Sequence, residues 1–349
     1  MNHLVIMAGG IGSRFWPMST PECPKQFLDI MGTGRTMIQQ TFDRFGGLVD
    51  IGHVWVVTSA KYAGLVAQQL SGINPQHILL EPCMRNTAPC NAYAAWKIQA
   101  EDPEAVIFVA ASDHLVTDSQ EFQRVVARGF DYVRQGNRIL TLGMRPTRPE
   151  TGYGYIEQGN LQEGDGEHDI FQLASFREKP DFLTAQQYLA TGRYTWNSGM
   201  FLWTVGTIVS EIRQYAPEIA AMMDRIAPSF FSPGEAAALA EYFPQCPKIS
   251  IDYAVMEQTR IASVMPAEFG WSDLGTWGSL RTLSPQDSDG NAVIGDGVKI
   301  LESKGCMVRM PQGKRVVIQG LEDCIVSEHN GTLLICKLSE EQRIKEWHD

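Results

Sequence analysis

Residues 4–27 read LVIMAGGIGSRFWPMSTPECPKQF. The apolar run at the start predicts a buried strand, and the glycines that follow it predict a loop whose main chain can approach a ligand closely. Successive N–H groups in such a loop form a nest that binds anions. Arg14 can hold two phosphate oxygens, and Lys25 supplies a compact positive charge. The stretch therefore predicts a polyphosphate site directly after a strand.

Two common phosphate motifs do not fit this loop. A dinucleotide-binding GxGxxG would need glycine at position 15, which is Phe15, and the chain has no GK[ST] run of a Walker A loop. The prolines between Arg14 and Lys25 should stiffen the loop and reduce the entropy lost on binding. Without a ligand we expect both cations to be exposed, as charged loop residues usually are.

Composition limits the choice of function. The chain has 349 residues, 44% of them apolar, which favours one large domain with a smaller one. A net charge of −11 argues against a general binder of nucleic acids or anionic membranes, so any positive site must be local. Seven cysteines without a CxxC pair indicate reduced thiols and a cytoplasmic protein. The first residues lack the pattern of a secretory leader, and no apolar run approaches the roughly 20 residues of a membrane span.

The first 145 residues alternate short apolar runs with helical patterns. Strands that are buried on both faces and separated by helices predict a Rossmann-like α/β domain of three layers with a mostly parallel sheet. Its ligands should gather at the carboxyl ends of the strands. The expected strands are residues 4–9, 53–59, 77–82, 105–113 and 138–144, and the expected helices are residues 36–45, 61–70, 87–101 and 119–133.

The rest of the chain is predicted to continue this domain and then to change character. Extended stretches and helices alternate up to about residue 280, where insertions should cover the substrate. A polar linker at 283–291 separates the catalytic domain, 1–282, from a small β-rich domain, 292–349. Apolar side chains recur there every six residues, but the period breaks at Gln312, so the prediction is a small β-domain, with a short left-handed β-helix as the alternative. The recurring residues are Ile294, Ile300 and Cys306.

The opening motif, GGxGxR followed by PKQ, resembles the signature of the sugar-phosphate nucleotidyltransferases, and in particular of the mannose-1-phosphate guanylyltransferases (GDP-mannose pyrophosphorylases). Further stretches follow in that family's order. They are EPCMRNTAP (81–89), ASDH (111–114), GYGYIE (152–157), FREKP (176–180), WNSGMF (196–201), SIDYAVME (250–257) and GWSDLGTW (270–277). Met18 stands where the family usually has leucine, and the chain is expected to lack the isomerase domain of longer relatives.

The resemblance implies transfer of GMP from GTP to α-D-mannose 1-phosphate by in-line attack on the α-phosphorus, which gives GDP-mannose and pyrophosphate. It implies that Arg14 grips the departing pyrophosphate and that Lys25 neutralises charge near the α-phosphate. Glu81 would accept hydrogen bonds from the N1–H and N2–H₂ edge of guanine. The other implied nucleotide-binding residues are Ala8, Gly9, Gly10, Gly12, Asn86, Thr87 and Ser112. Asn86 and Thr87 are as well placed to cap the following helix.

Metal and sugar sites are implied in the same way. Asp113 and Asp273 would be carboxylate ligands of Mg²⁺, which prefers carboxylates and phosphates together. The sugar-phosphate site would be formed by Gly152, Glu178, Lys179 and Asn197. Glu178 and Lys179 are adjacent, so on a regular strand they would point to opposite faces. One shared pocket requires the strand to end before the proline at 180.

Two alternatives stay open at this point. One is a related transferase that uses UTP or dTTP, against which EPCMRNTAP argues. The other is a catalytically silent relative that senses GDP-mannose; the presence of both cations and both aspartates argues against it. A nicotinamide oxidoreductase on a similar sheet fails at Phe15. The expected partners are GTP and mannose 1-phosphate, without nucleic acid or membrane, and the expected assembly is a homodimer.

Overall fold

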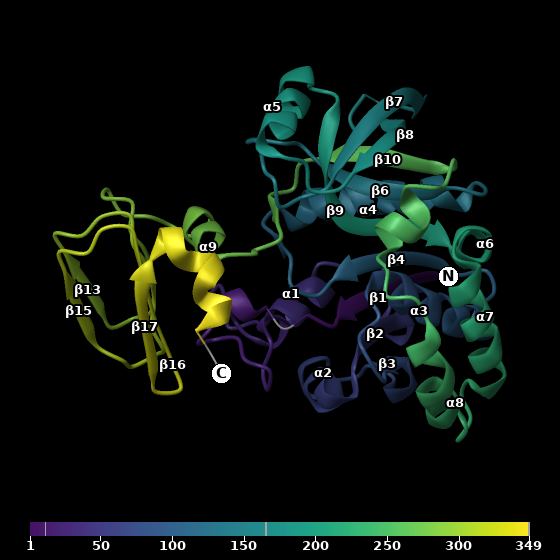
Figure 1. Ribbon diagram of the computed structural model, residues 1–349, viewed down its shortest axis with the longest axis horizontal. Coiled ribbons are helices and arrows are strands. Elements are labelled where there is room, and N and C mark those ends of the chain that lie inside the picture. Colours follow the sequence, from purple (N-terminus) through teal and green to yellow (C-terminus); the bar gives the residue numbers. More distant parts are fainter. Residues whose placement is uncertain (11, 165, 348–349) are drawn as a thin grey trace. The chain divides into compact units, whose positions relative to one another are not determined.

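The computed structural model describes residues 1–10, 12–164 and 166–347 of the chain (Figure 1). It divides into two compact units. Unit 1 contains Met1–Gly9, Phe42–Ala111 and Val116–Trp271, and unit 2 contains Gly10–Thr41, Ser112–Leu115 and Ser272–Asp349. The chain passes between the units after Gly9, within α1 (Met37–Asp43), after Ala111, and within the two-residue strands β5 (Leu115–Val116) and β11 (Trp271–Ser272). A boundary at residue 282 stays a prediction.

Unit 1 is built on a nine-stranded sheet in the order β3-β2-β1-β4-β9-β6-β10-β8-β7. The strands are β1 (Asn2–Ala8), β2 (Val54–Ser59), β3 (Ile78–Glu81), β4 (Val106–Ala111), β6 (Ile139–Met144), β7 (Tyr155–Glu163), β8 (Ile170–Arg177), β9 (Tyr194–Thr204) and β10 (Ala262–Ala267). All of them except β8 and β9 run in the same direction. The predicted mixed, mostly parallel sheet is therefore confirmed.

Helices cover both faces of this sheet, as Figure 1 shows, because its central strands carry apolar side chains on both sides. The helices of unit 1 are α2 (Ala63–Gln69), α3 (Thr87–Glu101), α4 (Ser119–Arg134), α5 (Phe182–Thr191), α6 (Val205–Tyr215), α7 (Pro217–Ile226), α8 (Glu235–Tyr242) and the π-helical turn η8 (Asp252–Met256). Val5 and Val109 pack in one core with α3 and α6. Phe108 points to the other face, where its ring meets that of Phe122 on α4. The result is the predicted three-layer arrangement.

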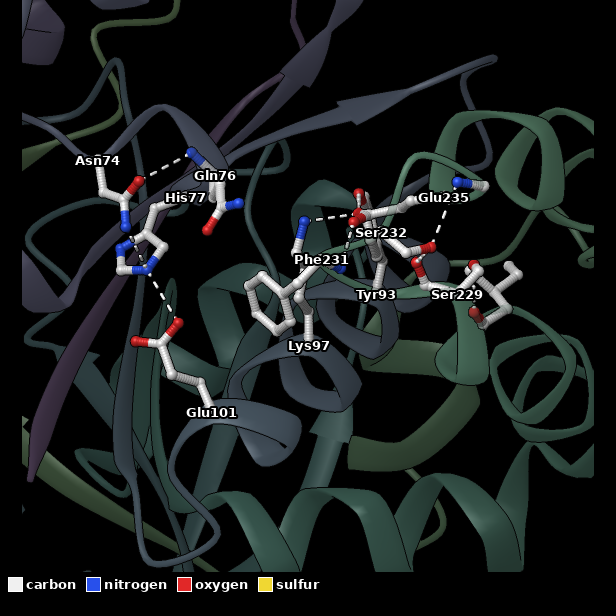
Figure 2. Close-up of polar contacts among 12 residues, drawn as sticks. Asn74, Gln76, His77, Tyr93, Lys97, Glu101, Ser229, Phe231, Ser232 and Glu235 are labelled. Carbon is white, nitrogen blue, oxygen red and sulfur yellow. Dashed lines mark hydrogen bonds and ion pairs between the residues drawn. The ribbon is translucent and has the colours of Figure 1, made fainter.

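Buried polar contacts fix α3, whose first residues belong to the candidate nucleotide site. Lys97 is 4% exposed, and its Nζ donates to Glu235 Oε1 at 2.5 Å. The Tyr93 hydroxyl donates to the same oxygen at 2.9 Å, so two side chains of α3 converge on the first residue of α8 (Figure 2). At the far end of α3, Glu101 Oε2 lies 3.1 Å from Nε2 of the buried His77, immediately before β3. These contacts hold α3 against β3, which ends at Glu81.

Unit 2 contains a short β-helix. Its first stack pairs β12 (Ala292–Ile294), β14 (Met307–Arg309) and β16 (Cys324–His329) in parallel, and its second pairs β13 (Val298–Leu301) with β15 (Val316–Gln319). β17 (Thr332–Lys337) closes the first stack antiparallel to β16. The predicted small β-domain is confirmed, and the parallel pairing of strands from successive turns favours its β-helix alternative, whose hand stays a prediction.

The core of unit 2 joins the β-helix to the glycine loop. Phe15 and Met18 of the loop share one apolar cluster with Met307 and Ile325 of the β-helix. Trp277 begins α9 (Trp277–Leu283) in the same cluster, and its ring centroid lies 5.1 Å from that of Phe15. The 3-10 segment η9 (Leu338–Glu346) adds Ile344. The loop that carries Arg14 and Lys25 therefore rests on the C-terminal part of the chain.

Candidate active site

The glycine loop begins where β1 ends, and only one of its three glycines is required by packing. Gly12 has φ = 67°, and a Cβ added there would lie 2.6 Å from Lys25 Cβ. A Cβ at Gly9 or Gly10 would meet no atom of the described residues within 4 Å. Gln26 donates from Nε2 to the Gly10 carbonyl at 2.9 Å and fixes the loop. Gly9 and Gly10 thus leave backbone open for a ligand.

Lys25 is the centre of a hydrogen-bonded cluster in unit 2. It lies in the 3-10 turn η2 (Lys25–Phe27), and its ammonium group donates to Asp113 Oδ2 at 3.2 Å. The same group donates to the main-chain oxygens of Asp273 at 2.9 Å and Leu274 at 2.8 Å. Lys25 is 3% exposed, so the expectation that it is exposed is wrong. Three hydrogen-bond acceptors compensate for the cost of burying its charge.

Asp113 and Asp273 both contact this ammonium group, Asp113 through its carboxylate and Asp273 through its main-chain oxygen. Burial acts to raise the pKa of Asp113, but Lys25 and then His114 outweigh it and hold the pKa below its ordinary value. Asp113 is therefore ionised at neutral pH, and its side chain is 36% exposed. Asp273 Oδ1 accepts from the Gly275 N–H at 3.1 Å. A Cβ at Gly275 would lie 2.6 Å from Asp273 Oδ2, so glycine at this position leaves space beside the second oxygen.

Arg14 lies beside the same turn. It belongs to the 3-10 turn η1 (Ser13–Phe15), and its Nη1 donates to the Gly275 carbonyl at 3.4 Å, the outer limit of a hydrogen bond. Its side chain is exposed, as predicted. The structure thus brings Arg14, Lys25, Asp113 and Asp273 together, although the aspartates are 160 positions apart in the sequence.

Ala8 and Ser112 contribute buried main chain. The Ala8 carbonyl accepts from Thr58 Oγ1 at 2.8 Å in unit 1. The Ser112 carbonyl accepts from Thr41 Oγ1 at 3.4 Å in unit 2, and the residue is 2% exposed. These contacts position the start of the loop and the residue before Asp113, while nucleotide contact by Ala8 or Ser112 stays a prediction.

Glu81 ends β3 with an unsatisfied oxygen. Its Oε1 is buried and has no hydrogen-bond partner among the described residues. Burial raises the pKa of Glu81 to about 7. A buried acceptor without a donor costs free energy, and such a group is expected where a ligand supplies the donor. The geometry therefore suits the predicted recognition of a purine edge.

Asn86 caps α3 in unit 1, and Thr87 is the first residue of that helix. Asn86 is the N-cap of α3, and its Oδ1 accepts from the Thr87 N–H at 2.8 Å. Thr87 Oγ1 accepts from the Ile251 N–H at 2.9 Å. The capping alternative is confirmed for Asn86, whereas direct nucleotide contact by either residue stays a prediction. The second bond ties the start of α3 to the segment that leads into Asp252.

The end of β8 explains how two adjacent side chains share a site. β8 ends at Arg177, and Lys179 has φ = 44°, which breaks the alternation of a strand. Lys179 Nζ lies 2.8 Å from Glu178 Oε1, and this hydrogen bond raises the pKa of Lys179 above its ordinary value. The predicted obstacle to a shared pocket is thus removed by the bend before Pro180.

Two further residues gather at this position that the sequence reasoning missed. Asp252 Oδ1 accepts from Asn197 Nδ2 at 3.0 Å, and burial followed by the charge of Glu178 raises the pKa of Asp252 to about 6. A Cβ at Gly154 would lie 2.7 Å from Glu178 Oε2 and 3.3 Å from Asn197 Cβ. Gly152, the predicted glycine, is exposed and donates to Glu150 Oε1 at 2.9 Å. The motifs SIDYAVME and GYGY contained both missed residues, so they were the available signal.

Known proteins match this chain over most of its length. The Nucleotidyl transferase family matches residues 3–290. The chain belongs to this nucleotidyltransferase family. Its fold agrees: a crystal structure described as mannose-1-phosphate geranyltransferase from Thermus thermophilus superimposes with a TM-score of 0.86 and 29% identity, over 99% of this chain and 97% of the other.

Curated relatives of the nucleotidyltransferase are similar over nearly the whole chain. Mannose-1-phosphate guanylyltransferase of Escherichia coli K12 is 38% identical over 98% of this chain and 71% of its own length. ManC of Salmonella typhimurium, which carries the same description, is 38% identical over the same shares. The resemblance inferred from the motifs is therefore confirmed. Among the described residues, no helix combines the length and apolar character that crossing a bilayer requires.

Proposed function

We propose that this chain transfers GMP from GTP to α-D-mannose 1-phosphate, with release of pyrophosphate. A phosphate oxygen of mannose 1-phosphate attacks the α-phosphorus of GTP, the bond from that phosphorus to the β-phosphate bridging oxygen breaks, and GDP-mannose is formed. The step joins two anions, so positioning and charge neutralisation supply most of the catalysis. The observation that carries the proposal is the Lys25 cluster, which gathers two cations and two carboxylates beside open glycine backbone.

The roles within the cluster follow from its contacts. The exposed Arg14 would bind the departing pyrophosphate, while the N–H groups of Gly9, Gly10 and Gly12 would hold the triphosphate. Lys25 already donates three hydrogen bonds, so it acts first by holding Asp113 and the 273–274 turn in place. It reaches the α-phosphate by exchanging one of these acceptors for a phosphate oxygen.

Asp113 and Asp273 fit a divalent metal ion, which we propose to be Mg²⁺. Their donors are hard carboxylate oxygens, Asp113 is ionised at neutral pH, and Gly275 leaves space beside one oxygen of Asp273. When bound, the ion would draw negative charge from the phosphates and orient them. Lys25, which donates to the Asp113 carboxylate and to the Asp273 main-chain oxygen, would keep these two residues together when the phosphates enter.

Base and sugar selection are assigned to unit 1. Glu81 would accept from guanine N1–H and N2–H₂, donors that pyrimidines do not offer in this pattern. Glu178 and Asn197 would bind sugar hydroxyl groups and Lys179 the sugar phosphate, with Asp252 orienting the Asn197 amide.

We further propose a cytoplasmic homodimer, for which the exposed apolar Leu333 and Ile335 on β17 would provide contact surface.

The test is pyrophosphate release from full-length protein with Mg²⁺, each nucleoside triphosphate in turn and a panel of hexose 1-phosphates. GTP with mannose 1-phosphate should give the highest kcat/KM, with GDP-mannose identified by mass spectrometry. A preference for UTP or dTTP would replace the substrate assignment. Tight binding of GDP-mannose without any turnover would favour the sensing relative instead.

A further inference from the structure

Unit 2 contains a cavity of about 630 Å³ that has no part in the proposed transfer reaction. Its walls come from the 28–34 segment, from the ends of β12, β14 and β16, and from the turns that follow β12 and β14. Leu28, Ile294 and Met310 supply apolar surface, while Arg309, Glu328 and His329 supply polar groups. We name it the Arg309 pocket. Its volume is within the range of small-molecule sites, which combine apolar walls with a few placed polar groups.

Among the described residues Arg309 forms no ion pair, although the charge of Asp29 partly opposes the burial that lowers the pKa of Arg309. Its Nη1 donates to the Met310 carbonyl at 2.9 Å and its Nη2 to the Asp29 carbonyl at 3.1 Å, both neutral acceptors. Its Nε is buried and has no hydrogen-bond partner among the described residues. The Asp29 carboxylate is itself occupied by the N–H groups of Thr33 at 2.9 Å and Gly34 at 2.7 Å. A guanidinium held in this way is preorganised for an anion.

Glu328 offers an acceptor in the same pocket. It is 8% exposed, its Oε1 accepts from the Gly331 N–H at 2.8 Å, and its Oε2 has no hydrogen-bond partner within the described part of the chain. Lys314 Nζ lies 3.8 Å from Oε1, too far for a hydrogen bond. A ligand hydroxyl group could donate the hydrogen bond that this buried Oε2 lacks. A ligand that satisfies both residues must carry an anionic group and hydroxyl groups.

One wall of the pocket leads directly to the catalytic lysine. Leu28 follows η2, and its N–H donates to the Lys25 carbonyl at 3.1 Å, while its own carbonyl accepts from the Met37 N–H at 3.1 Å. Gly32 allows this wall to lie against the β-helix, because a Cβ there would be 2.8 Å from Ile294 Cγ2. A ligand that contacts Leu28 and Asp29 would therefore bias the position of Lys25.

We propose that the Arg309 pocket binds a small phosphorylated polyol of the sugar-phosphate class, and that its occupancy changes the catalytic rate through residues 28–34. The phosphate bonds to Arg309, the hydroxyl groups bond to Glu328, and the sugar ring lies against Leu28 and Met310. Only the effect on rate depends on the proposed function. By linkage, binding in the pocket and binding of substrates alter one another's affinity by the same factor.

Binding is tested by calorimetric titration of the full chain, without nucleotide, with glucose 6-phosphate, glucose, inorganic phosphate and spermidine. Glucose 6-phosphate has no phosphate at C1 and so cannot act as the acceptor. It should bind with one site per chain, at least tenfold more tightly than inorganic phosphate, while glucose should show no binding. Binding of spermidine alone would overturn the proposal, because it would mean that the acidic residues of the pocket select a cation.

Variants locate the site. Arg309→Gln and the isosteric Glu328→Gln should each raise the Kd for glucose 6-phosphate at least tenfold and leave basal pyrophosphate release unchanged. Arg315→Gln, an exposed arginine of the same β-helix, is the matched control and should bind as wild type does. Glu328→Gln keeps the shape of the side chain, so it answers the question even if Arg309→Gln fails to fold. Binding that is unaffected in both variants, or that GTP displaces competitively, places the ligand elsewhere and overturns the proposal.

The rate effect is measured separately. Saturating glucose 6-phosphate should change kcat or the KM of the wild-type enzyme at least twofold and should leave both unchanged in Glu328→Gln. If glucose 6-phosphate binds in the pocket but changes neither kcat nor KM, the proposed coupling to the catalytic rate is overturned. Absence of any pyrophosphate release would instead count against the proposed function, and the calorimetric result would still decide whether the pocket binds a sugar phosphate.

Discussion

At the scale of single residues, Lys25 shows how far residue type determines role. A lysine after a glycine loop predicts a phosphate contact, but the sequence cannot tell which acceptors other segments will bring to it. Asp113 and the 273–274 turn arrive from distant positions and bury the ammonium group. The choice of residue was predictable because it depends on local chemistry, whereas its burial depends on tertiary packing.

Lys25→Met should therefore impair stability as well as activity. The change leaves Asp113 and two carbonyl oxygens without their shared donor, which should lower the free energy of unfolding by about 1–3 kcal/mol. Arg14→Met is the matched control, since an exposed side chain usually changes stability by less than about 0.5 kcal/mol. Both variants should lose most pyrophosphate release. Urea denaturation of the two proteins measures the difference, and equal stability would argue against Lys25 as the organising residue.

Glu81 should make the use of GTP depend on pH. With its pKa raised to about 7, the ionised fraction rises from about a tenth at pH 6 to about nine tenths at pH 8, so the KM for GTP should fall about tenfold over this range. Because burial raises the pKa in the folded state, the contribution of Glu81 to stability falls as pH rises from about 4.3 through 7. Glu81→Gln should remove the pH dependence of KM. A variant that keeps the same pH profile would exclude Glu81 from base recognition.

At the scale of elements, the β7–β9 region shows why spacing along a strand is not enough. The motif GYGY offers two glycines, and only the fold decides which one faces Glu178 and Asn197. The bend at Lys179 and the approach of Asp252 likewise depend on segments that meet after folding. Five early strands and four helices were predicted close to their observed bounds, since each has its own apolar pattern. A proline within β10 and the alanine-rich sequence of α8 make the apolar patterns of these two elements weaker than those of the early elements.

Gly154→Ala should disrupt the sugar site while Gly152→Ala should not. An added Cβ at Gly154 would lie 2.7 Å from Glu178 Oε2 and displace the carboxylate, so the KM for mannose 1-phosphate should rise at least tenfold, about 1.4 kcal/mol. At Gly152 the Cβ would meet only the movable end of Glu150, at 3.1 Å. Initial rates at saturating GTP compare the two variants. Should Gly152→Ala be the more damaging change, the original assignment of Gly152 to the sugar site would be restored.

At the scale of the whole molecule, the class of the fold was predictable from the sequence, whereas the pairing and packing of distant segments were not. Alternating strands and helices predict a mainly parallel sheet, but the order of nine strands depends on pairings between distant segments. The β-helix was expected as a separate domain after a linker. That division stays a prediction, but Met307 and Ile325 of the β-helix and Ile344 of η9 share a core with Phe15 of the glycine loop. The sequence does not show which apolar residues pack together, so this shared core could not be predicted from it.

Loss of this shared core should affect catalysis even though the β-helix contributes no predicted catalytic residue. Ile325→Ala should lower the free energy of unfolding by about 2–5 kcal/mol and reduce activity, because a cavity opens beneath the glycine loop. Val317→Ala, at a side chain of the same β-helix that is 69% exposed, is the control and should leave both unchanged. Removal of residues 292–349 should give a poorly soluble, inactive chain. A soluble truncation with full activity would contradict this dependence.

Asp113 and Asp273, organised by Lys25, are proposed to hold the divalent ion that supports GMP transfer. The most direct measurement is pyrophosphate release from GTP and mannose 1-phosphate across a magnesium titration, starting in chelator, for wild type, Asp113→Asn, Asp273→Asn and the exposed control Asp131→Asn. Wild type and the control should be inactive in chelator and share one titration curve. Each site variant should lose at least about a hundredfold in rate, about 2.7 kcal/mol of barrier, and need more magnesium. Activity that survives chelation, or site variants that titrate like wild type, would contradict the account.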